Sequence, residues 1–161
     1  MVPKIIRDGS IVDDEWILLD EDVPGDQQPH TIVPLSDWLS RGRKPAPDTD
    51  VGVWLNSDED PRLIVDDLAD IALIALNFPV FSDGRPYSSA TLLRRVHAYQ
   101  GELRAVGDVR RDQMEQMHRC GFNAYQLAEG QDLTAALAGF KLFSHSYQSS
   151  IDRPQPLFRI R

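Results

Sequence analysis

The sequence predicts an α/β fold in which repeated βα units build a parallel sheet, preceded by a short irregular N-terminal lead-in with a β-hairpin. Short apolar runs alternate with helical segments from residue 51 onwards, which is the pattern of repeated βα units. One run, residues 71–76, is apolar throughout, as strands buried on both faces are. The length of 161 residues suits one domain with a core of its own.

The first fifty residues are predicted to be a lead-in that is not an independent domain. Asp8, Gly9 and Ser10 separate two apolar runs and indicate a hairpin. Residues 34–39 favour a short helix, and residues 44–48, which include two prolines, favour an extended connector. We therefore divide the chain into a lead-in over residues 1–50, an α/β core domain over residues 51–148 and an extended tail over residues 149–161.

The core domain is predicted to hold four strands, each followed by a helix. The strands are predicted over residues 51–55, 71–76, 103–106 and 122–127. The first helix begins at Pro61, and the other three are capped by Ser88, Asp108 and Asp132. Apolar residues at steps of three and four, up to Phe143, place one side of the last helix in the core.

The loops that follow the four strands are expected to share one edge of the sheet. Ligands of parallel α/β folds bind at this carboxyl edge. The spacings leave open whether the strands form a partial barrel or a small doubly wound sheet, and the short loops after the third strand favour the partial barrel. The polar residues and glycine placed at this edge are Asn56, Asn77, Asp83, Arg85, Gly107, Asp108 and Glu129.

The loop over residues 77–88 is the strongest candidate for a binding site. Phe78, Phe81 and Tyr87 can form an apolar wall, while the Asp83-Gly84 turn presents Arg85. The structural alternative is that Arg85 only pairs with Asp83 or Asp108. The candidate ligand- or partner-binding residues are Asn77, Phe81, Asp83, Gly84, Arg85, Tyr87, Gly107, Asp108 and Arg111.

Gly107 and Asp108 lie at a predicted strand-to-helix junction, where free backbone N–H groups can bind an anion. One glycine does not make a phosphate loop, and the chain contains neither a Gly-x-Gly-x-x-Gly nor a Walker sequence. The simpler interpretation is that Asp108 is a helix cap and that Gly107 permits close packing.

Charge and cysteine content exclude several classes of function. The net charge of −8 argues against nucleic-acid and anionic-membrane partners. No apolar run is long enough to span a bilayer and the N-terminus has no signal sequence, so we expect a cytoplasmic protein. Cys120 is the only cysteine, and the histidines lack metal-type spacing, so we expect no metal site.

Arginine is concentrated in residues 78–121, which contain seven arginines, five acidic residues and no lysine. Arginine is preferred where planar, bidentate contact with carboxylate or phosphate matters. The segment therefore suggests anion or carboxylate binding, with pairing inside the chain as the simpler alternative.

Four segments, residues 78–88, 92–95, 101–109 and 119–122, resemble the bacterial domain-of-unknown-function family 934. Proteins of that family are commonly described as oxidoreductases associated with sulfite reduction, so the resemblance implies a role in that process. Pro86 stands where the family has glycine, which stiffens the loop. The resemblance carries over no catalytic residue.

Six-electron sulfite reduction needs haem-type and iron–sulfur cofactors, and one cysteine cannot hold a cluster. The leading hypothesis is therefore an accessory protein of assimilatory sulfite reduction that has no cofactor of its own. It would bind sulfite reductase, another sulfur-assimilation protein or a small anion. One alternative is an oxidoreductase that uses a borrowed flavin or nicotinamide, and another is a purely structural homodimer.

Overall fold

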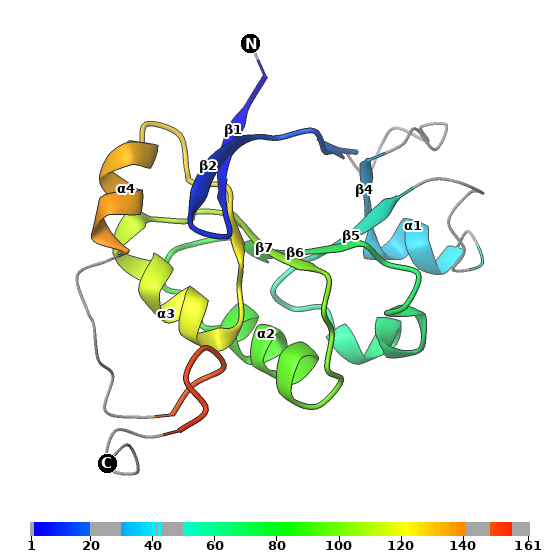
Figure 1. Cartoon of the computed structure of the whole chain (residues 1–161). Helices are drawn as coiled ribbons and strands as arrows, with labels where there is room; N and C mark the ends of the chain where they lie inside the picture. Colours follow the sequence, from blue (N-terminus) through cyan, green and yellow to red (C-terminus); the bar gives the residue numbers. More distant parts are fainter. Residues whose placement is uncertain (1, 20–29, 41, 43–49, 141–148, 156–161) are drawn as a thin grey trace.

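The computed structural model describes residues 2–19, 30–40, 42, 50–140 and 149–155 (Figure 1). Its strands are β1 (Lys4–Arg7), β2 (Ser10–Asp13), β3 (Ile17–Leu18), β4 (Thr31–Pro34), β5 (Val51–Leu55), β6 (Leu73–Phe78), β7 (Glu102–Gly107) and β8 (Ala124–Tyr125). Its helices are α1 (Leu35–Ser40), α2 (Arg85–Arg95), α3 (Met114–Cys120) and α4 (Leu133–Gly139), with 3-10 helices η1 (Pro61–Asp67) and η2 (Arg111–Gln113).

The eight strands form one sheet in the order β2-β1-β8-β7-β6-β5-β4-β3. Strands β3 to β8 are parallel and adjacent in chain order, whereas β1 pairs antiparallel with both β8 and β2. The sheet curls into a half-barrel. This confirms the α/β prediction and favours the partial barrel over the doubly wound sheet.

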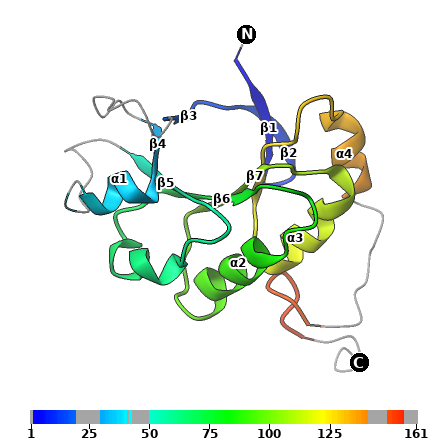
Figure 2. The ribbon, with the colours of Figure 1, turned by 180° about the vertical axis from the view of Figure 1, so that it is seen from behind.

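The helices lie along the convex side of this sheet. Parallel strands that follow one another in order, joined by crossovers of one hand, place their helices on one face. Figures 1 and 2 show α1, α2 and α3 along the outside of the curve. The main core lies between them and the sheet, where Ile74 and Leu76 of β6 pack with Leu93 of α2 and Met117 of α3. Among the described residues, no helix is long and apolar enough to cross a membrane.

The concave side of the sheet is covered by the chain itself. Residues 13–17, which join β2 to β3, pass over the open side of the curve (Figures 1 and 2). Trp16 packs there against a second, smaller cluster that includes Ile32, Leu73 and Val106. This segment therefore takes the place of the strands that would close a full barrel.

A buried ion pair fixes the same segment. Leu103 and Ala105 of β7 face the main core, so Arg104 between them faces the concave side. Arg104 Nη1 donates to both oxygens of Asp14 at 3.0 Å, and Nε donates to Glu102 at 2.8 Å. The side chains of Arg104 and Asp14 are only 1% and 8% exposed.

Several predicted boundaries are confirmed by local geometry. The Asp8-Gly9 turn has φ of 49° and 75°, the positive values that a two-residue hairpin requires. The Asp132 carboxylate accepts hydrogen bonds from the N–H groups of Thr134 and Ala135, so it caps α4 as predicted. The predicted connector at residues 44–48 and Phe143 lie outside the described residues.

Other boundaries were wrong. Helix α2 begins at Arg85 and not at Ser88, because Pro86 suits the first turn of a helix and Gly84 precedes it. Asp108 does not cap the following helix, which begins at η2 after Arg110, because its carboxylate is used by the preceding loop. Strand β4 was missed, since its four residues end in a proline that is untypical of an inner strand.

Breaking the buried ion pair is expected to destabilise the fold strongly. Asp14→Ala leaves the Arg104 charge buried without its bidentate partner, so the free energy of unfolding should fall by about 3–5 kcal/mol. Lys4→Ala, which removes the exposed Lys4–Asp13 pair, is the matched control and should change it by less than about 1 kcal/mol. Urea unfolding followed by circular dichroism measures both, and equal losses would contradict the assignment.

Candidate functional site

Three loops meet at the carboxyl edge of the neighbouring strands β5, β6 and β7. The Asn77 amide donates to Asn56 Oδ1 at 3.0 Å, which joins the ends of β6 and β5. Arg85 Nη2 donates to Ser57 Oγ at 2.8 Å, which joins the start of α2 to the loop after β5. The loops therefore form one connected surface, as the strand order implies.

Gly107 permits β6 and β7 to approach closely at this edge. Its φ is 91°, and a Cβ atom there would collide with the side-chain oxygen of Asn77 and the carbonyl of Phe78. The next two N–H groups are already bonded, since Asp108 N donates to Phe78 O and Val109 N donates to Gly107 O, each at 2.8 Å. The junction therefore serves close packing and does not present these N–H groups to an anion.

Arg85 is held by Asp83, two residues before it. Its Nε and Nη2 donate to both oxygens of that carboxylate at 2.6–3.2 Å. These side-chain hydrogen bonds lower the pKa of Asp83 well below its ordinary range, with a further contribution from the Arg85 backbone N–H. The structure therefore shows the pairing that the sequence offered as the alternative for Arg85, although the guanidinium remains largely exposed.

Exposed apolar side chains lie at this edge in the Phe81 tip, which we define as Val80, Phe81 and Arg110. The Phe81 side chain is 50% exposed, and the Arg110 guanidinium lies over its ring at 4.4 Å from the centroid. Phe81 N donates to Asp108 Oδ2 at 3.0 Å, and Gln113 Nε2 donates to Phe81 O at 2.5 Å. The backbone of this exposed aromatic residue is thus held by two hydrogen bonds, and Arg110 covers one face of its ring.

Asp108 connects the two parts of the Phe81 tip. Its carboxylate accepts from Arg110 Nε at 3.1 Å as well as from the Phe81 N–H. The hydrogen bond from Arg110 lowers the pKa of Asp108, and the Phe81 N–H adds to this effect. The carboxylate is therefore ionised near neutral pH, which keeps both hydrogen bonds in place.

The structure does not bring all predicted site residues together. Phe78 is fully buried and Tyr87 packs against it with ring centroids 5.2 Å apart, so these two do not form an exposed wall with Phe81. Arg111 lies apart from the loops, at a cavity between helices. The residues that do share the edge are Asn77, Phe81, Asp83, Gly84, Arg85, Gly107 and Asp108.

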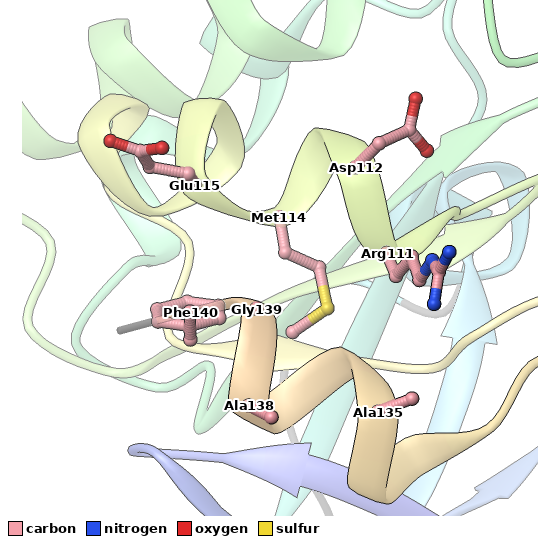
Figure 3. A pocket seen from close by; sticks show the side chains of 8 residues that line it. All are labelled: Arg111, Asp112, Met114, Glu115, Ala135, Ala138, Gly139 and Phe140. Carbon is pink, nitrogen blue, oxygen red and sulfur yellow. The ribbon is translucent and has the colours of Figure 1, made fainter. Parts of the chain in front are cut away.

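A cavity of about 520 Å³ lies between α3 and α4 (Figure 3). Figure 3 shows Met114 pointing between the two helices, with Arg111 and Asp112 at one end and the Phe140 ring at the other. The α4 side is lined by Ala135, Ala138, Gly139 and Phe140. The predicted apolar side of α4 does pack on the core, through Ala136 and Leu137. The prediction missed the adjoining row of small side chains, which leaves space beside Met114.

The seven arginines of residues 78–121 have divided roles. Arg85, Arg104 and Arg110 pair with carboxylates, which is the intramolecular alternative. Arg94 instead donates to the carbonyl oxygens of Tyr99, Gly101 and Gly121 and fastens α2 to the loops around it. Three arginines remain, namely Arg95, Arg111 and Arg119. None of them forms an ion pair with another described residue.

The described ranges contain no group of three or more His, Cys, Asp or Glu side chains that could hold a metal ion. The half-buried thiol of Cys120 has its pKa raised by burial.

Removing the Asp108 carboxylate is expected to loosen the Phe81 tip. In Asp108→Asn the charge-assisted bond to Arg110 is lost, so amide exchange at Phe81 measured by NMR should be faster. Asp58→Asn, an equal charge change in the neighbouring loop, should leave it unchanged. In the parent protein the pKa of Asp108 is lowered, so its ionised carboxylate stabilises the Phe81 tip fully above pH 3.8, the ordinary pKa. This stabilisation is lost as the pH falls through the folded-state pKa. Unchanged exchange in Asp108→Asn would contradict the assignment.

No curated protein and no solved structure is similar enough to this chain to be matched. A family model does match, over residues 52–158, and its description is "Bacterial protein of unknown function (DUF934)". The match covers β5 to β8, all of the carboxyl-edge loops and α4. Because the model matches about two thirds of the chain, this protein belongs to the bacterial family DUF934.

Proposed function

We propose that this protein is an accessory protein of assimilatory sulfite reduction and that it binds its partner through the Phe81 tip at the carboxyl edge. The observation that carries the proposal is the exposed Phe81 ring, which lies under Arg110 on a backbone that Asp108 and Gln113 hold in place. Aromatic and arginine side chains are enriched at protein interfaces and supply much of their binding energy.

Rigidity of the Phe81 tip favours binding. A side chain that is already ordered loses less conformational entropy when a partner covers it. Val80 is 52% exposed beside Phe81, so the tip offers adjoining apolar surface with a cation above it. A partner with an apolar pocket and a carboxylate at its rim fits this surface.

The sulfite-reduction part of the proposal is supported by the resemblance of residues 78–88 and 101–109 to proteins described in that context. An accessory role is favoured over direct reduction because Cys120 is the only cysteine of the chain, and iron–sulfur clusters are held by several thiolates. The proposed partner is accordingly sulfite reductase or another sulfur-assimilation protein.

The proposal predicts a growth defect that depends on Phe81. A bacterium that lacks this gene should grow poorly on sulfate and recover on sulfide or cysteine. Complementation with Phe81→Ser should fail, because it removes the apolar contact, whereas Val2→Ser, a change at a similarly exposed residue, should complement. Growth of the deletion strain on sulfate at the normal rate would remove the pathway assignment.

A direct binding measurement separates the accessory role from catalysis. Purified protein is titrated with sulfite reductase of the same bacterium and, separately, with flavin and nicotinamide nucleotides. The accessory role is supported if the protein binds the reductase saturably and Phe81→Ser weakens this binding at least about tenfold. A loss of this size is expected for an aromatic residue at the centre of an interface. Saturable binding of a nucleotide, with none to the reductase, would favour the oxidoreductase hypothesis.

A further inference from the structure

A second, polar cavity lies on the helical side of the molecule, away from the Phe81 tip. Its volume is about 230 Å³, which has room for several water-sized groups. The ends of α2 and α3 and the segment at residues 149–151 form its walls, and Ile151 N holds that segment to Arg119 O at 3.0 Å. The lining includes Thr91, Arg95, Gln116, Arg119, Ser149 and Ser150.

This cavity has a surplus of positive charge. Arg95 and Arg119 both line it, and neither forms an ion pair with another described residue. Within the described part of the chain, no carboxylate lines it. Asp152, which follows the lining segment, accepts a hydrogen bond from Ser150 and lies 3.8 Å from the Arg153 guanidinium, which offsets its charge.

Arg119 carries an unsatisfied donor. Its Nε atom is buried and has no hydrogen-bond partner among the residues that the structure describes. A buried donor without a partner costs free energy, and in native proteins such groups usually meet a ligand, an ion or a bound water. The other groups that can donate into the cavity are the Arg95 guanidinium, the Gln116 amide and the Ser149 hydroxyl.

We infer that this cavity binds an oxyanion, such as a sulfate, sulfonate or phosphate group, with Arg95 and Arg119 as its charged ligands. Guanidinium groups match the spacing of oxygen atoms on these anions. The basic side chains come from the last turns of two helices that contact each other, so both can reach one anion.

An apolar groove continues from the cavity and gives room for an organic substituent. The groove has a volume of about 450 Å³ and shares Thr91, Arg95 and Cys120 with the cavity. Leu92 and Val96 line it, and Val96 is among the most exposed apolar side chains of the described chain. An inorganic oxyanion would occupy the cavity alone, whereas an organic one would also cover this groove.

Calorimetric titration with sodium sulfate and with sodium benzenesulfonate tests the site. Arg95→Gln and Arg119→Gln should each weaken binding about tenfold or more, because each removes a charged hydrogen-bond donor. Arg62→Gln, the same change at an exposed arginine of η1, should have no effect. Arg95 is exposed, so its variant should keep the fold, and circular dichroism checks both variants.

Alkylation of Cys120 by iodoacetamide gives a second readout, since the thiol lies in the wall of the cavity and of the groove. Either anion should slow alkylation in the parent protein and not in Arg95→Gln. If benzenesulfonate binds more tightly than sulfate, and Val96→Asp abolishes this difference, the natural ligand is an organic oxyanion. If the two salts bind equally, the ligand is an inorganic one. Absence of saturable binding, or equal binding by the parent protein and Arg95→Gln, would overturn the inference.

Discussion

The half-barrel depends on covering the concave face of its sheet, which none of the described helices packs against. The ion pair between Asp14 and Arg104 anchors the segment that covers this face. A full barrel fills its interior with side chains from all around the wall, but the eight strands found among the described residues make only half of one. The segment that carries Asp14 and Trp16 supplies both a charge for Arg104 and apolar cover for Leu73 and Val106. Without this segment, both the apolar side chains of the concave face and the Arg104 guanidinium would be exposed to water.

The covered concave face also helps to position the loops at the carboxyl edge of the sheet. With the sheet fixed from both sides, β5, β6 and β7 end in register, and their loops are tied by short polar contacts. The Phe81 tip inherits this rigidity through Asp108 and Gln113. The cationic cavity instead depends on how the ends of α2 and α3 meet residues 149–151, so the two surfaces are structurally separate.

Features encoded within a few residues could be predicted from the sequence, and so could the parallel sheet that repeated βα units imply. Particular side-chain contacts between distant residues could not. The Asp8-Gly9 turn, β5 and the Asp132 cap depend on local geometry, and so does the Asp83–Arg85 pair. Asp14, one of the two carboxylate partners of Arg104, lies 90 residues away, and no local pattern reveals it. Likewise, Phe78 is buried as the last residue of β6, whereas Phe81 follows it in an exposed turn. The strand was predicted to end at residue 76, so the two residues were assigned to one loop.

The pairing of β1 with β8 has a consequence for synthesis on the ribosome. Ile6 lies opposite Tyr125 in the sheet, so the N-terminal hairpin cannot reach its place until the last strand has emerged. At the usual rates of translation this delay is roughly 6–24 seconds. Throughout that time the edge of β1 has unpaired N–H and C=O groups, which are prone to pairing with other chains. The nascent protein is therefore most exposed to misassembly before β8 is made, and a chaperone would have to act on its first strand during that interval.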